Sequence, residues 1–125
     1  MSAIADSCAL IVFLRDPDAQ RTMPNAFHYL KSRPVHVPPM VVWEISRLVA
    51  FGKLPRLPVA LPDLLRAHGF SFLPMTWEVA EAAETLPPIH RDPVDRIIVA
   101  HALRQDMPIL TSDGTIPAYG VTTIW

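Results

Sequence analysis

Residues 90–113 read HRDPVDRIIVAHALRQDMPILTSD, and this stretch predicts a helix followed by a buried strand. The helix is expected to begin at Asp92, because an aspartate followed by a proline suits the N-cap and the first position of a helix. The apolar run that follows and the short segment PILT fit a buried helix and a buried strand. Asp95 stands near the start of this unit and Asp113 at its end, so these acids are either caps and turn residues or parts of one site.

The rest of the chain also alternates short apolar strands with helices, which is typical of an α/β domain. We expect a three-layer α/β/α sandwich with a mainly parallel sheet, forming one domain over residues 1–125. Helices are expected over residues 7–14, 25–33, 38–54, 62–68, 76–86 and 92–106, and strands over residues 2–6, 35–37, 70–74, 108–111 and 121–125, with a polar loop over residues 16–24.

Composition limits the classes of protein that the chain can represent. The length of 125 residues suits one domain, and the 50% hydrophobic content is enough for one core. The net charge of −1 gives no general basic signature of nucleic-acid binding. The single Cys8 excludes an intrachain disulfide and fits a reducing cytoplasm. With neither a secretory signal nor an apolar run long enough to span a bilayer, we expect a cytoplasmic protein that does not enter the membrane.

Four acidic residues from separate segments are expected at one edge of the sheet. In a parallel sheet, ligands bind at the carboxyl ends of the strands, where the following helices begin. Asp6 ends the first predicted strand and Asp113 ends the strand PILTS. Asp95 opens the helix that precedes that strand, and Glu44 lies in the second turn of the helix after VHV. The topology therefore predicts a cluster of four carboxylates.

Each acidic residue also has a purely structural explanation. Asp6 and Asp92 suit helix N-caps, and Asp95 falls three residues after Asp92, at a capping-box position. Asp113 stands in an ordinary turn, and Glu44 could form an ion pair one turn along its helix. For each residue taken alone, the structural explanation stays open.

The set of acids argues more strongly for a site than any one of them. Like charges about 4 Å apart repel by roughly 4 kcal/mol at an effective dielectric constant near 20. A bound cation removes this repulsion, and hard oxygen ligands without His or Cys favour Mg²⁺ or Mn²⁺. Such an ion can activate water for attack on a phosphodiester. The acids together therefore predict a metal site.

Other conspicuous residues are assigned structural roles. His90 and His101 have no companion at the spacing of zinc ligands, so we expect core or rim positions for both. Trp43, Trp77 and Trp125 are expected to pack in the core. The chain contains no G-x-G-x-x-G motif and no P-loop, which argues against a nucleotide cofactor.

Four segments of the chain resemble the PIN-domain ribonucleases, and specifically the VapC-type toxins of bacterial toxin–antitoxin pairs. They are IADSCAL, VVWEISRLVAFGKL, HRDPVDRIIVAHAL and ILTSDGTIPAYGVTTIW, and their order, their spacing and the total length all fit. The resemblance implies a catalytic quartet of metal ligands with accessory positions beside it. The quartet would be Asp6, Glu44, Asp95 and Asp113, and the accessory positions Asp92, Ser7 and Ser112.

The resemblance implies an endoribonuclease that depends on Mg²⁺ or Mn²⁺ and leaves a 5′-phosphate and a 3′-hydroxyl. It also implies a homodimer and a cognate antitoxin protein that inserts a segment into the active-site groove. Relatives commonly carry a basic residue directly after the last aspartate, where this chain has Gly114. The candidates for contact with RNA phosphates are Arg47, Lys53, Arg91 and Arg96.

Two other classes of function are considered. A non-catalytic PIN-like module would bind RNA or a protein without cleavage, but a decayed site would be expected to lose acids, and the quartet is complete. A phospho-acceptor receiver domain also has an acidic edge, but it needs a lysine after one of the last strands. The only lysines are Lys31 and Lys53, so the sequence favours the nuclease.

Overall fold

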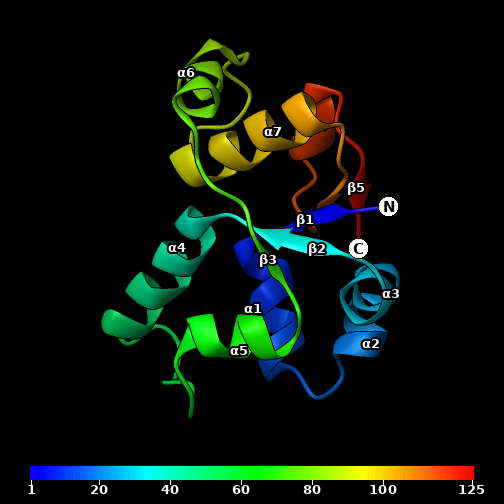
Figure 1. Ribbon diagram of the computed structural model, residues 1–125, viewed down its shortest axis with the longest axis vertical. Helices are drawn as coiled ribbons and strands as arrows, with labels where there is room; N and C mark the ends of the chain where they lie inside the picture. Colours follow the sequence, from blue (N-terminus) through cyan, green and yellow to red (C-terminus); the bar gives the residue numbers. More distant parts are fainter.

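The computed structural model describes residues 1–125 and consists of a parallel sheet covered by helices (Figure 1). The strands are β1 (Ala3–Ala5), β2 (Val35–Val37), β3 (Ser71–Phe72), β4 (Ile109–Leu110) and β5 (Thr123–Ile124). The helices are α1 (Ser7–Arg15), α2 (Ala19–Thr22), α3 (Pro24–Ser32), α4 (Pro39–Ala50), α5 (Leu61–Ala67), α6 (Trp77–Thr85), α7 (Pro93–Gln105) and the 3-10 helix η1 (Ile116–Tyr119).

The sheet has the strand order β3-β2-β1-β4-β5, and every neighbouring pair is parallel. Helices α6 and α7 lie on one side of the sheet, while α1 and α5 lie on the other (Figure 1). The predicted three-layer α/β/α architecture with a parallel sheet is therefore confirmed.

Strand order reverses next to the central strand. The chain builds β1, β2 and β3 towards one edge and then returns to place β4 and β5 on the other side of β1. Ile4 of β1 pairs with His36 on one side and with Ile109 on the other. The carboxyl ends of β1 and β4 therefore flank a topological switch point, which is where ligands bind in sheets of this kind.

The core lies on both faces of β1. Its residues Ala3, Ile4 and Ala5 are fully buried, as expected for a central parallel strand covered by helices on both sides. Helix α7 adds Ile98 to this core, together with the predicted core residue His101. Neither ring nitrogen of His101 has a hydrogen-bond partner, and burial lowers the pKa of this side chain, so the core favours the neutral imidazole.

Two elements differ from the sequence prediction. The polar loop over residues 16–24 contains the short helix α2, because the Asp16 carboxylate accepts hydrogen bonds from the Asp18 amide and the Thr22 hydroxyl. Helix η1 was not expected between the last two strands. Neither element changes the order of the sheet.

The prediction that Trp43 and Trp77 pack in the core is wrong, whereas Trp125 is partly buried and packs against the core as expected. Trp43 is 50% exposed and Trp77 is 91% exposed. In α4, Val41 and Ile45 form the buried face, and a residue midway between them in sequence points to the opposite side of the helix. Trp77 is the first residue of α6, whose buried face begins at Val79.

None of the helices is both long and apolar enough to cross a membrane.

Candidate metal centre

A pocket of about 180 Å³ lies at the switch point of the sheet. It brings together all four acids that the sequence analysis selected, although they come from four separate segments. The pocket is lined by Asp6, Ser7, Cys8, Glu44, Asp95, Thr111, Ser112 and Asp113.

Asp6 both caps a helix and faces the pocket. It follows β1 directly and is the N-cap of α1, where Oδ1 accepts the Ala9 amide at 2.8 Å. Burial raises the pKa of Asp6 to about 6; hydrogen bonds from Thr111 and Ala9 counteract this, whereas the charges of Glu44 and Asp113 add to it. The predicted N-cap is therefore confirmed, and the same side chain lines the pocket.

Asp95 is presented by the first turn of α7. The predicted cap of this helix is correct, since Asp92 Oδ1 accepts the Val94 amide at 2.9 Å. The capping-box explanation of Asp95 is wrong, because the Asp92 amide donates to His90 Nδ1 instead. Burial raises the pKa of Asp95 to about 7; the charges of Asp92, Asp6 and Glu44 also raise it, and that of His90 lowers it.

Asp113 is held by three hydrogen bonds in the loop after β4. Its Oδ1 accepts the Thr115 amide at 2.9 Å and the Thr115 hydroxyl at 2.8 Å, and its Oδ2 lies 2.8 Å from His90 Nε2. Partial burial opposes ionisation, but these hydrogen bonds and the neighbouring His90 outweigh it and lower the pKa of Asp113. The contacts therefore favour the ionised carboxylate.

Glu44 reaches the pocket from α4. The ion pair with Arg47 that the sequence allowed does not form; the Arg47 guanidinium lies over the rings of Trp43 and Phe51, 5.0 Å from each centroid. The Glu44 carboxylate thus has no cation from its own helix. Its burial is intermediate, and it contributes negative charge to the environments of Asp6 and Asp95.

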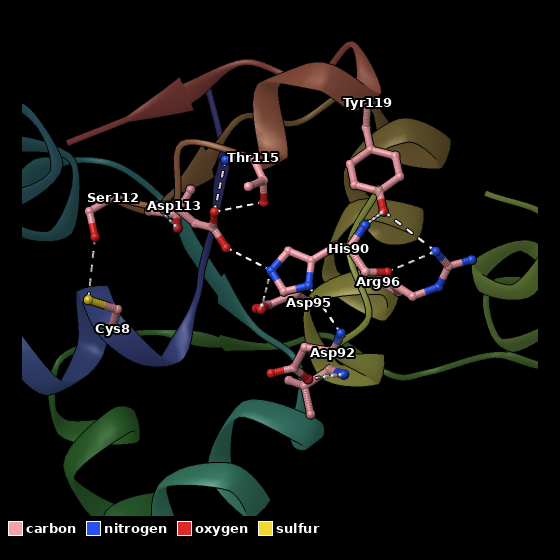
Figure 2. A network of polar contacts seen from close by, with 11 residues as sticks. Cys8, His90, Asp92, Asp95, Arg96, Ser112, Asp113, Thr115 and Tyr119 are labelled. Carbon is pink, nitrogen blue, oxygen red and sulfur yellow. Dashed lines mark hydrogen bonds and ion pairs between the residues drawn. The ribbon is translucent and has the colours of Figure 1, made fainter. Parts of the chain in front are cut away.

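His90 is the functional-site residue that sequence reasoning missed. It was assigned a core or rim position, but Figure 2 shows its ring between two of the acids. Nε2 lies 2.8 Å from Asp113 Oδ2 and 3.1 Å from Asp95 Oδ2. Its only signal in the sequence was its place two residues before the cap of the helix that carries Asp95.

The loop that carries His90 is fixed by Arg96. This guanidinium donates hydrogen bonds to the carbonyls of Ala83, Leu86, Pro87 and His90, at distances from 2.7 to 3.2 Å. Four of its five N–H donors are therefore occupied within the fold, and its expected contact with RNA phosphates stays a prediction. The other three candidates for phosphate contact are exposed: Arg47, Lys53 and Arg91.

The accessory residues add oxygen atoms around the acids. Ser7 is buried, lines the pocket, and its Oγ has no hydrogen-bond partner in the protein. Ser112 Oγ lies 3.7 Å from Cys8 Sγ at the rim (Figure 2). A buried hydroxyl without a partner is costly unless something else occupies the pocket. Four carboxylates and an orphaned hydroxyl match the ligand preference of a hard divalent cation.

Comparisons with known proteins agree with this architecture. The family model described as PIN domain matches residues 3–121. The FitAcB crystal structure from Neisseria gonorrhoeae has a TM-score of 0.71 and 20% identity, covering 100% of this chain and 97% of that chain. A toxin–antitoxin complex from Klebsiella pneumoniae has a TM-score of 0.67 and 15% identity, covering 98% of this chain and 96% of that chain.

A third structure has the same fold at lower identity. It is VapBC2 from Rickettsia felis bound to a DNA fragment from its promoter, with a TM-score of 0.65 and 9% identity, covering 98% of this chain and 97% of that chain. At such identities the structural likeness establishes the fold. A search of curated protein sequences finds no significant match.

Proposed function

Because the chain belongs to the PIN domain family, we propose that it is a metal-dependent endoribonuclease, the toxin component of a toxin–antitoxin pair. The observation that carries the proposal is the convergence of four carboxylates on one pocket at the switch point of the sheet. The pKa values of Asp6 and Asp95 are raised to about 6 and about 7, so the metal-free pocket resists full ionisation. A pocket of this kind is suited to a cation.

The proposed metal ligands are Asp6, Glu44, Asp95 and Asp113, and the proposed ion is Mg²⁺ or Mn²⁺. The acids supply only oxygen donors, which suit these hard ions. When bound, the ion would neutralise phosphate charge and activate water for hydrolysis. Asp92 supports the site by capping the helix that presents Asp95, and Ser7 and Ser112 are the proposed accessory hydroxyls.

The proposed substrate is RNA, cleaved to leave a 5′-phosphate and a 3′-hydroxyl. Arg47, Lys53 and Arg91 are the proposed phosphate contacts, since all three are exposed and are not used in ion pairs within the fold. The residue after the last acid, Gly114, offers no side chain for this purpose.

The proposed partners are a cognate antitoxin protein and a second copy of this chain. Support comes from the folds of similar structures, two of which are described as a toxin–antitoxin complex and as VapBC2 bound to promoter DNA. The proposed active unit is a single PIN-like domain over residues 1–125, acting in the cytoplasm.

The test is cleavage of RNA by protein purified free of any partner. Total RNA and tRNAs would be incubated with Mg²⁺, Mn²⁺ or EDTA, and the ends of the fragments would be identified. Asp6→Asn is the inactive variant, and Glu81→Gln, an exposed acid on α6, is the matched control. We expect discrete metal-dependent fragments with 5′-phosphates from wild type and Glu81→Gln only.

Folded protein that binds Mg²⁺ but cleaves no RNA, even when it is offered the RNA of its own host, would contradict the nuclease proposal. It would favour a non-catalytic RNA- or protein-binding module. Equal cleavage by Asp6→Asn would reject the ligand set.

A further inference from the structure

We propose that His90 is a positioning residue of the metal centre, whose Nε2–H group orients the Asp113 carboxylate beside Asp95 without binding the metal. The inference rests on the proposed function, because it takes these two acids as metal ligands. It assigns a role to a side chain that contacts two members of the acidic quartet without belonging to it.

The ring approaches both acids through a single atom. Nε2 lies 2.8 Å from Asp113 Oδ2 and 3.1 Å from Asp95 Oδ2, and the ring is mostly buried, with 19% of the side chain exposed. The contact with Asp113 has the geometry of a hydrogen bond, whereas the contact with Asp95 is a close approach without that geometry. Both distances would also suit two neighbouring ligands of one ion, since ligands at about 2.1 Å from an octahedral ion lie roughly 3.0 Å apart. Distance alone therefore does not separate a hydrogen-bond donor from a metal ligand.

The other ring nitrogen decides between these two roles. The backbone amide of Asp92 donates a hydrogen bond to His90 Nδ1 at 3.1 Å (Figure 2). An amide N–H can only donate, so Nδ1 carries a lone pair there, and the one proton of the neutral ring sits on Nε2. A metal bound at Nε2 would move this proton to Nδ1, where it would point at the amide hydrogen. The geometry therefore assigns Nε2 the role of donor.

The ring is also fixed from its backbone. The His90 amide donates to the Tyr119 hydroxyl at 2.7 Å, and the His90 carbonyl accepts from Arg96 at 3.2 Å. Arg96 also reaches the Tyr119 hydroxyl at 3.5 Å, which ties η1 to the loop (Figure 2). The orientation of the imidazole is therefore set by the fold before any metal binds.

This hydrogen bond leaves Asp113 able to bind a cation. A carboxylate oxygen has two lone pairs, so Oδ2 of Asp113 can accept from His90 and still present a lone pair to the pocket. On Asp113 the two bonds from Thr115 already hold Oδ1, so His90 completes the orientation of the carboxylate. Donors that orient metal ligands in this way commonly account for 10- to 100-fold in metal affinity.

The first test is the tautomer of His90, read by long-range proton–nitrogen NMR on protein whose histidines carry the NMR-active nitrogen isotope. Spectra would be recorded at about pH 8, where ordinary imidazoles are neutral. The signals would be assigned with the His90→Gln variant and recorded without metal and with saturating Mg²⁺. We expect the Nε2–H tautomer in both states.

An Nδ1–H tautomer in the metal-free protein would overturn the proposal, whether or not the protein cleaves RNA. A switch to Nδ1–H on adding Mg²⁺ would also overturn it and make His90 a ligand. Neither reading depends on nuclease activity, so failure of the proposed function and failure of this inference are distinguishable.

The second test compares metal affinities by calorimetry with Mg²⁺ and Mn²⁺. His90→Leu removes the donor and should weaken binding about tenfold or more. His90→Gln keeps an N–H donor at a similar reach, so its metal affinity should stay within a few-fold of wild type. The control is His28→Leu, an exposed residue of α3, and its metal affinity should also be close to wild type. Unchanged binding by His90→Leu would contradict the proposal because the ring would contribute nothing to metal affinity, and tighter binding would mean that the ring competes with the metal.

Discussion

Replacing Asp95 by asparagine should stabilise the metal-free protein at alkaline pH while abolishing the proposed activity. Burial, with the negative charges of the neighbouring acids adding to it, raises the pKa of Asp95 from its ordinary 3.8 to about 7. Because the pKa is higher in the folded state than in the unfolded state, ionisation of Asp95 lowers the free energy of unfolding. The stability contributed by the protonated form is therefore complete at low pH and is lost as the pH rises through about 7.

The size of the effect follows from this pKa. At about 1.36 kcal/mol per pH unit, the difference between 3.8 and about 7 corresponds to roughly 4 kcal/mol. An asparagine at the same place must still be desolvated, so we expect about half of this, about 2 kcal/mol, as the gain at about pH 8. The gain should largely disappear at about pH 4, where wild-type Asp95 is protonated in the fold.

The assay is urea unfolding with EDTA at both pH values, with Glu81→Gln as the control for loss of an exposed charge. Excess Mg²⁺ should then make the wild-type protein more stable than Asp95→Asn at alkaline pH. A ligand at a hundredfold its Kd stabilises the binding protein by about 2.7 kcal/mol, and Asp95→Asn should gain little. A variant less stable than wild type at about pH 8 in EDTA, or equally stabilised by Mg²⁺, would refute the reasoning.

Three further results are expected. Metal affinity should rise about tenfold or more from about pH 5 to about pH 8. Asp6 and Asp95, whose pKa values are raised to about 6 and about 7, must lose protons to bind a cation. A metal affinity that does not change with pH in calorimetry would count against this ligand set. Arg96→Ala should lower the free energy of unfolding by about 3 kcal/mol in urea titrations, since several carbonyls lose a charged donor. A loss below about 1 kcal/mol would show that the loop does not need the Arg96 guanidinium. A Cβ added at Gly114 meets no atom within 4 Å, so Gly114→Lys should be accommodated, tighten RNA binding and steepen its salt dependence, as measured by fluorescence anisotropy. An unchanged affinity would mean that RNA does not pass this point.

The fold and the four acids could be predicted from the sequence because local signals specify them. Asp92 followed by a proline marks the start of α7, and the apolar run after it marks a buried helix. Parallel topology then places the ends of β1 and β4 at one edge, so Asp6 and Asp113 had to lie near each other. These inferences need only periodicity, caps and a parallel sheet; that β1 and β4 are neighbouring strands comes from the structure.

His90 and Arg96 could not be assigned in this way, because their roles depend on tertiary contacts of irregular backbone. Arg96 looks like a helix-face charge in the sequence, yet its partners are carbonyls at the end of α6 and in the following loop. His90 enters the site because that loop is tied to η1 through Tyr119, and η1 itself was not predicted. Trp43 was misplaced because hydrophobicity was weighted above its position on α4.

The most direct test of the four-carboxylate metal centre is anomalous X-ray scattering from crystals soaked in Mn²⁺, with Asp6→Asn crystals as the control. The wild-type protein should show an anomalous peak in the pocket, ligated by oxygens of the acidic quartet (Asp6, Glu44, Asp95 and Asp113), and the variant should show a weaker peak or none. No peak there at saturating Mn²⁺, or an equally strong peak in the variant, would contradict the account.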